Sequence, residues 1–222
     1  MSKGRRVTRV GGIAVLALGT LGLPVSGDET QTRPGSEEVS DKSSFSSPNG
    51  AALFDASGYR LRAYRAPVPA SAPGAQTVTL DEVQSLQSGG AILIDVMGLQ
   101  RFHIDAAGEW ITPSGPGAAH DTIPGAAWLP VVGWGEPEPW QEDYLRQSLA
   151  DLTSGDRGRP VVVFCKTDCW LSWNAARRIA ELGQEKVYWF PGGSDDWADA
   201  GLELTRARPY PLPNGAGRPP AP

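Results

Sequence analysis

The segment PVVVFCKTDCWLSWNAARRIAEL, residues 160–182, carries the clearest fold signal in the chain and holds its only two cysteines. Residues 160–164 form a short apolar run of the kind that makes a buried strand. Residues 170–182 have the spacing of an amphipathic helix, and a glycine follows them as a stop signal. Cys165 and Cys169 therefore fall at a turn between a strand and a helix.

The flanking segments repeat this alternation. Residues 77–90 predict a helix, because Thr79 and Glu82 form a capping box and Gly89 ends the pattern. The other expected elements are strands at 91–96 and 186–190, a helix at 140–152, and a short acidic helix at 195–200 capped by Ser194. Alternating strands and helices indicate βαβ units. We therefore expect an α/β fold, a small doubly wound parallel sheet of about five strands with helices on both faces.

The ends of the chain differ from the middle in composition. Residues 1–27 combine a basic start with a short apolar run and small residues before Gly27, which is typical of a signal peptide. Residues 28–57 are polar and predict a disordered linker. Residues 58–206 contain the predicted domain, and residues 207–222 are rich in proline and glycine and predict a disordered tail. These features predict export to the periplasm, with an uncleaved N-terminal anchor as the alternative.

The net charge is −5, and the pI is about 5.1. This acidic balance lacks the basic footprint of a nucleic-acid-binding protein. The apolar run in the first 27 residues is too short for a comfortable membrane span. We therefore expect neither a nucleic-acid partner nor a stable membrane span after cleavage of the signal peptide.

The end of the 160–164 strand is the expected functional site, because ligands of parallel sheets bind beyond the carboxyl ends of strands. A thiol beside a helix N-terminus faces the positive end of the helix dipole and unpaired N–H groups, and both lower its pKa. Lys166 adds a positive charge, whereas Asp168 opposes it, and we interpret Asp168 as the cap of the next helix. We expect Cys165 to be the nucleophile and Cys169 the resolving thiol.

The same region is similar to the active-site half of rhodanese-like domains. In that family a strand delivers a nucleophilic cysteine into a loop whose amides cradle a persulfide, and a helix, a strand and a Gly-Gly-x-x-x-Trp element follow. The matching residues are Cys165, Gly192, Gly193 and Trp197, with LIDV at 93–96 and IPGA at 123–126 upstream. The resemblance runs from about Thr77 to Leu204. It implies a covalent persulfide on Cys165 and no bound cofactor.

The resemblance also suggests which residues form the site. The loop that would hold an anion comprises Lys166, Thr167, Asp168, Trp170 and Ser172, and the residues expected to support it from behind are Asp95 and Asn174. Three positions depart from the family pattern. Met97 and Trp170 stand where arginines are usual, and Thr122 stands in place of a histidine, with His120 nearby. Because the arginines would bind thiosulfate, we expect weak thiosulfate:cyanide sulfurtransferase activity or none.

Four segments together resemble a narrower exported family of rhodanese-like proteins. They are GYRLRAYRAPVPA at 58–70, IPGAAWLPVVGWG at 123–135, CWLSWNAAR at 169–177 and YWFPGGSDDW at 188–197. That family is named for a CXXCW motif and is associated with catabolism by dehydrogenases that depend on pyrroloquinoline quinone (PQQ). The implied partners are a small sulfur or thiol substrate, or an exported quinoprotein dehydrogenase.

Two other interpretations of the cysteines remain open at this stage. An oxidising compartment favours a structural disulfide, which would leave a non-catalytic accessory or binding module. A Cys-x-x-x-Cys pair with His103 or His120 has the ligand types that suit Cu(I) or Zn, which would make the protein a metal chaperone. Whether the protein is an enzyme depends on which interpretation holds.

Overall fold

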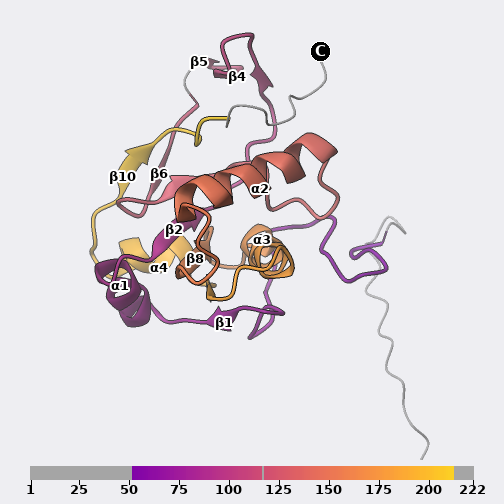
Figure 1. The fold of residues 1–222 in the computed structure, drawn as a ribbon. Coiled ribbons are helices and arrows are strands. Elements are labelled where there is room, and N and C mark those ends of the chain that lie inside the picture. The colour runs from indigo at the N-terminus through magenta and orange to yellow at the C-terminus, as the bar shows by residue number, and fades with distance from the viewer. Residues whose placement is uncertain (1–51, 117, 213–222) are drawn as a thin grey trace, which may run out of the picture. The chain divides into compact units, whose positions relative to one another are not determined.

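A parallel sheet of five strands forms the centre of residues 52–116 and 118–212, the part of the chain that the computed structural model describes (Figure 1). Its spatial order is β1 (Gln76–Thr77), β9 (Val187–Phe190), β8 (Val161–Phe164), β2 (Ile92–Asp95) and β7 (Ala127–Trp128). All neighbouring strands are parallel. The described residues belong to one compact unit, Ser43–Pro222.

Two pairs of helices cover the two faces of this sheet. Side chains alternate along the strands, so that Val162 and Phe164 of β8 pack with Val83 and Trp197, which lie on α1 (Leu80–Ser88) and α4 (Gly193–Asp199). Val161 and Val163 face the other way, towards α2 (Pro139–Thr153) and α3 (Trp170–Glu181). The predicted α/β fold with about five strands and helices on both faces is confirmed.

A set of short strands between β2 and β7 was not expected from the sequence. β3 (His103–Ile104), β4 (Trp110–Thr112) and β5 (Gly115–Pro116) form an antiparallel sheet. β6 (His120–Thr122) pairs with β10 (Thr205–Ala207), which follows α4. Strands of two or three residues are too short to show a period of two, which is why the pattern did not reveal them.

Of three predicted helix caps, one is confirmed and two are wrong. Thr79 and Glu82 form the capping box of α1. Cys169, not Asp168, occupies the N-cap of α3, and Asp168 adopts a left-handed backbone with φ of 54°. Ser194 lies inside α4, because that helix begins at Gly193, two residues earlier than predicted, and docks its first turn on the cysteine loop.

Residues on both sides of the predicted 58–206 domain make contacts with it. The ring of Phe54, within the predicted linker, packs edge-on against Trp170 at 5.3 Å between centroids. Within the predicted tail, the amide of Tyr210 donates to the carbonyl of Trp128 (2.7 Å), and its own carbonyl accepts from Tyr144 (2.7 Å). The packed ring of Phe54 and the hydrogen-bonded backbone of Tyr210 therefore extend the fold beyond residues 58–206.

The predicted signal peptide, most of the predicted linker and residues 213–222 of the predicted tail lie outside the described residues. Among the residues that are described, none of the helices has the length and apolar character required to cross a membrane.

Candidate active site at the cysteine pair

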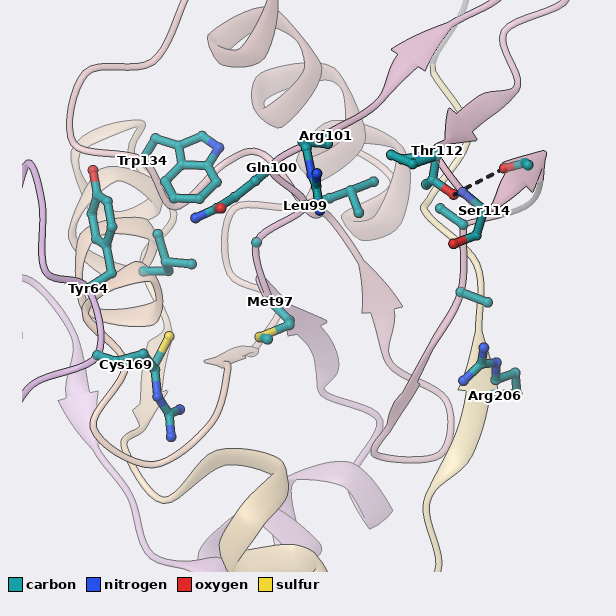
Figure 2. A pocket seen from close by; sticks show the side chains of 17 residues that line it. Tyr64, Met97, Leu99, Gln100, Arg101, Thr112, Ser114, Trp134, Cys169 and Arg206 are labelled. Atoms are coloured by element: carbon teal, nitrogen blue, oxygen red, sulfur yellow. Dashed lines mark hydrogen bonds between the residues drawn. The ribbon is translucent and has the colours of Figure 1, made fainter.

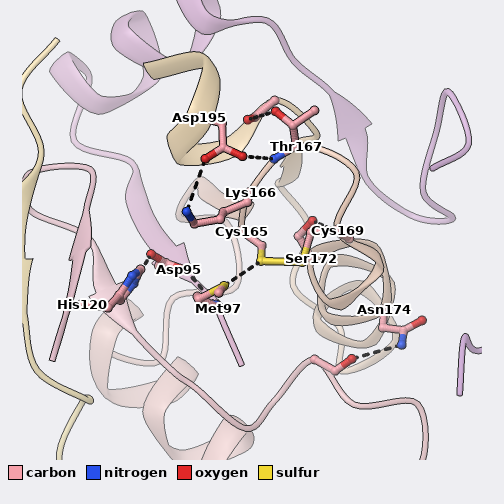
Figure 3. The surroundings of a disulfide bond; sticks show 12 residues. Asp95, Met97, His120, Cys165, Lys166, Thr167, Cys169, Ser172, Asn174 and Asp195 are labelled. Atoms are coloured by element: carbon pink, nitrogen blue, oxygen red, sulfur yellow. Dashed lines mark hydrogen bonds and ion pairs between the residues drawn. A yellow bond between two sulfur atoms is a disulfide. The ribbon is translucent and has the colours of Figure 1, made fainter. Parts of the chain in front are cut away.

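Cys165 and Cys169 are joined by a disulfide at the carboxyl edge of the sheet, between the end of β8 and the start of α3 (Figure 3). Their Cα atoms are 6.2 Å apart. Both residues are almost fully buried, with exposed fractions of 1% and 2%. The structure therefore shows the oxidised form of the pair that the sequence singled out.

The first turn of α4 holds one side of the cysteine loop. The amide of Ser194 donates to the carbonyl of Cys165 (2.9 Å), and the hydroxyl of Thr167 donates to the carbonyl of Gly192 (2.8 Å). The carboxylate of Asp195 accepts from the amide of Thr167 (3.2 Å) and pairs with the ammonium of Lys166 (3.5 Å). Lys166 and Thr167 are therefore engaged with α4 (Figure 3).

Gly193 makes this close approach possible. Its backbone pairs with that of Lys166 and has φ of 59°, a conformation that L side chains rarely adopt. A Cβ atom at this position would collide with the backbone of Cys165. The second glycine of the Gly-Gly-x-x-x-Trp element thus allows α4 to lie directly against the cysteine loop.

A segment near the start of the domain holds the other side of the loop. The backbones of Arg65 and Cys169 form an antiparallel bridge. The amide of Trp170 donates to the carbonyl of Tyr64 (2.9 Å), and the amide of Ala66 donates to the carbonyl of Asp168 (3.0 Å). Backbone hydrogen bonds thereby join residues 64–66 to residues 168–170, next to the disulfide.

Two tryptophans at the start of α3 anchor this segment. The indole of Trp170 donates to the carbonyl of Pro67 (3.1 Å), and that of Trp173 donates to the carbonyl of Ser71 (2.9 Å). Both rings are buried. Trp170, at the position of the family's usual arginine, is therefore a packing residue rather than a ligand for an anion.

The expected anion cradle needs a correction. The amide of Thr167 is already occupied by Asp195, and that of Trp170 by Tyr64. The hydroxyl of Ser172 is also turned inward, where it donates to the carbonyl of Cys169 (2.9 Å) and accepts from an indole of β9. In this disulfide form these donors bond to neighbouring segments and do not converge on Cys165.

Of the two residues expected to support the loop from behind, Asp95 is linked to it through Met97 and Asn174 is not. Asp95 is fully buried; its carboxylate accepts from the amide of Met97 (2.8 Å) and lies 2.7 Å from Nε2 of His120. Asn174 instead bonds to both backbone groups of Arg60 and to another carbonyl, pointing away from the disulfide (Figure 3). Asn174 therefore secures the N-terminal segment of the domain.

Met97 covers the sulfur of Cys165. Its Sδ atom lies 3.7 Å from Cys165 Sγ, and its own backbone is fixed by Asp95 and by the indole of Trp128 (2.7 Å). A thioether is neutral and polarisable, so it packs well against a sulfur atom but cannot attract an anion. The loss of the family's arginine thus places an apolar cover over the expected nucleophile.

A pocket of about 680 Å³ opens beside the disulfide. Cys169 lines it, together with Met97, whereas Cys165 does not (Figure 2). Three segments supply most of the remaining lining, and three single residues complete it. The segments are the N-terminal segment (Tyr64 and Arg65), the stretch after β2 (Gly98 to Arg101) and the region of the inserted short strands (Thr112 to Gly115, with Ala118 and Ala119). The single residues are Trp134, Leu171 and Arg206.

The pocket carries positive charge. Arg65, Arg101 and Arg206 line it, and no acidic residue does. Arg206 is paired with Asp121 at 3.3 Å. Burial raises the pKa of the Tyr64 phenol, so that side chain is neutral at ordinary pH. The pocket is thus suited to an anion.

Sequence reasoning missed these arginines because Arg65 and Arg206 lie on the flanks of the domain and Arg101 lies in an irregular stretch. The density of arginine in RLRAYR, residues 60–65, was the only signal. The metal interpretation gains no support: among residues 52–116 and 118–212, no group of three His, Cys, Asp or Glu side chains is placed to hold an ion.

The family model of the rhodanese-like domain matches residues 79–200, which is more than half of the chain. This chain therefore belongs to the rhodanese-like domain family. A search of curated proteins gave no match.

Solved structures with a similar fold include a thiosulfate sulfurtransferase from Pseudomonas aeruginosa, at 18% identity and a TM-score of 0.38; the match covers 59% of this chain and 20% of that chain. A polysulfide-sulfur transferase homodimer from Wolinella succinogenes has 21% identity and a TM-score of 0.37, over 60% of this chain and 79% of that one. This chain therefore spans about a fifth of the first structure's length. At these identities and scores, the likeness carries no argument about activity.

Proposed function

We propose that this protein is an exported rhodanese-like protein that carries out thiol–disulfide or sulfane-sulfur chemistry at the Cys165–Cys169 pair. One observation carries the proposal: the disulfide borders a pocket of about 680 Å³ at the carboxyl edge of the sheet. Ligands of parallel sheets bind at this edge. A disulfide that can be reached from a pocket can exchange with a thiol, whereas one sealed in the core cannot.

The second candidate is an accessory module with a permanent structural disulfide. The attachment of the loop on both sides and the burial of both cysteines favour it. Against it, the two cysteines are only four residues apart. Closing so short a loop stabilises the fold by about 2 kcal/mol through chain entropy, the low end of the usual range. The disulfide therefore contributes little to the free energy of unfolding, and a chemical role explains its position better.

Two finer parts of the proposal, cleavage after Gly27 and residence in the periplasm, come from the composition of residues 1–27. Two others, a persulfide as one state of the pair and service to a PQQ-dependent dehydrogenase, come from the sequence resemblance. The loop is poorly suited to thiosulfate, because Met97 and Trp170 occupy the positions of the usual arginines. Turnover of thiosulfate and cyanide at about 1–1,000 per second would contradict this view of the loop.

Intact mass spectrometry of the protein recovered from a periplasmic fraction tests the proposal. The proposal expects the mature mass in two interconvertible forms, a disulfide and either a dithiol or a form that is one sulfur atom heavier. Treatment of the native protein with excess thiol should convert the disulfide, and any form that is one sulfur atom heavier, to the dithiol. A disulfide that opens only after the protein is unfolded would establish the structural role instead.

A further inference from the structure

Of the two cysteines, only Cys169 lines the pocket. Cys165 lies behind Met97, whose Sδ is 3.7 Å from Cys165 Sγ. Figure 2 shows the sulfur of Cys169 at one side of the hollow, beside Met97. In thiol–disulfide exchange the attacked sulfur is determined by access as well as by chemistry. Any nucleophile in the pocket therefore meets Cys169 first.

The local electrostatics make Cys169 a good leaving group once it carries the substrate as a mixed disulfide. Cys169 occupies the N-cap of α3, a helix of twelve residues, and has no side-chain cap hydrogen bond. A thiolate at a helix N-terminus is stabilised by the helix dipole, which lowers the pKa of the thiol. Cys165 lies four residues earlier against a thioether, an apolar neighbour that disfavours a thiolate. Access therefore selects Cys169 for the first attack, and the stabilised thiolate favours the release of Cys169 from the mixed disulfide in the second step.

Arginine side chains supply a binding site for a negative charge near Cys169. The backbone of Arg65 pairs with that of Cys169, and residues opposite each other on antiparallel segments project to the same side. Both residues line the pocket. Neither Arg65 nor Arg101 forms an ion pair with another residue of the described ranges, whereas Arg206 pairs with Asp121. Two charged guanidinium groups therefore remain available to an anion.

The rest of the wall limits the size and type of the ligand. Leu99, Trp134 and Leu171 line the pocket together with Tyr64. The rings of Tyr64 and Trp134 pack edge to face at 5.1 Å between centroids, and the amide of Gly135 donates to the Tyr64 hydroxyl. This apolar wall suits the carbon skeleton of a small molecule, and the guanidinium groups suit its acidic groups.

We infer that Cys169, rather than Cys165, is the sulfur that exchanges with substrate, and that the substrate is a small anionic thiol held by Arg65 and Arg101. The inference rests on the proposed function and reverses the roles that the sequence suggests for the two cysteines.

The reaction follows from this placement. The substrate thiolate attacks Sγ of Cys169, a bond forms between the two sulfurs, and the electron pair of the Cys165–Cys169 bond leaves with Sγ of Cys165, which takes up a proton. A second molecule of the same thiol attacks the substrate sulfur of the mixed disulfide and releases Cys169 as a thiolate. Two thiols are oxidised to one disulfide, and the protein disulfide is reduced to a dithiol.

Three thiols of similar size and different charge test the substrate class. They are 2-mercaptoethanesulfonate, 2-mercaptoethanol and cysteamine, each at the same thiolate concentration with the native oxidised protein. We expect the sulfonate to open the disulfide about tenfold faster than the neutral thiol, with cysteamine the slowest, because the arginines concentrate anions. Raising the salt concentration should shrink the difference. Equal rates for all three would overturn the assigned substrate class.

Arginine variants locate the source of the preference. Arg65→Gln and Arg101→Gln should each reduce the ratio of sulfonate to neutral rate severalfold. Arg146→Gln is the matched control, because Arg146 is an exposed arginine of α2 that is paired with Asp143 and does not line the pocket. A ratio that falls equally in all three variants would show that net charge, not the pocket, sets the preference.

Single-cysteine variants identify the exchanging sulfur. In reduced Cys165→Ser, Cys169 should react with an anionic methanethiosulfonate reagent at least about ten times faster than Cys165 does in Cys169→Ser. Acid quenching of the wild-type reaction, followed by peptide mass spectrometry, should place the mixed disulfide on Cys169. A mixed disulfide on Cys165 would overturn the inference and leave the proposed function intact. A native disulfide inert to every thiol would overturn the proposed function itself.

Discussion

The two sides of the cysteine loop are held by parts of the chain with different relations to the family. On the side of Cys165, α4 lies against the loop, and its contacts come from residues inside the 79–200 match. On the side of Cys169, the bridge comes from Tyr64 to Ala66, which precede the match. The comparison suggests that the family fold buries one sulfur and supplies most of the pocket beside the other, while segments outside the match add Tyr64, Arg65 and Arg206 to that pocket.

The additions also replace one source of positive charge with another. Within the family pattern, Met97 and Trp170 take the positions of arginines and make packing contacts. Arg65 and Arg206, outside the match, and Arg101, inside it, line the pocket beside Cys169. The positive charge expected at the loop is therefore present in this chain, but it lies where it can act on Cys169.

The largest expected effect is on the α4 side. Gly193→Ala should destabilise the protein by about 3 kcal/mol or more, because it adds a collision with the Cys165 backbone to the cost of a positive φ. Gly201→Ala is the control, since Gly201 has φ of 76° but open space around its Cβ position. Urea unfolding measures both. If both variants lost the same free energy of unfolding, the close contact between Gly193 and the backbone of Cys165 would not be important for stability.

The next effect is on the side of the N-terminal segment. Trp170→Ala should cost about 3–4 kcal/mol and should also speed proteolytic cleavage within residues 52–66, because it removes the anchor to Pro67. Trp197→Ala is the control: that tryptophan is equally buried, at 6% exposed, but packs on the other face of the sheet. If both variants are cleaved equally fast at the same place, the segment is not anchored by Trp170.

A smaller change tests the cover over Cys165. In a Cys169→Ser background, Met97→Ala should raise the rate at which neutral methanethiosulfonate modifies Cys165 by about tenfold, because the thioether no longer blocks the sulfur. Met97→Leu preserves most of the volume and should leave the rate nearly unchanged. A rate that stays low in the alanine variant would mean that another group shields Cys165.

The smallest effect is a pH dependence of the N-terminal segment. Burial acts to raise the pKa of Glu181, but the hydrogen bond from Tyr59 and the contact with Arg177 outweigh it and hold that pKa below the ordinary value of 4.5. Because the folded pKa is the lower one, the stabilisation is present above pH 4.5 and is lost as pH falls through the folded value.

Hydrogen exchange at residues 57–62 should therefore accelerate below pH 4.5 in the wild type. Glu181→Gln should show faster exchange at neutral pH and a flatter acid response. An identical acid response in the two proteins would assign the change to another carboxylate, such as Asp55, whose pKa is also lowered: burial acts to raise it, and hydrogen bonds from the backbone and from Ser57 outweigh that effect.

Local signals in the sequence predicted the regular elements well. The apolar run at 161–164 and the capping box of Thr79 and Glu82 depend on neighbours a few residues away, and both form as expected. The predicted caps at Asp168 and Ser194 are wrong because those two turns are shaped by distant segments docking on them. A propensity is a local quantity and cannot register such docking.

The sequence by itself determined the fold class, the family and the position of both cysteines at a strand–helix turn, because these follow from periodicity and from motifs read along the chain. Only the tertiary structure decided which sulfur faces a pocket and which charges surround it. Arg65, Arg101 and Arg206 are brought together from positions up to 141 residues apart. Convergence of this kind depends on how the segments pack, since hydrogen bonds such as that between Trp170 and Tyr64 join residues that no sequence period relates.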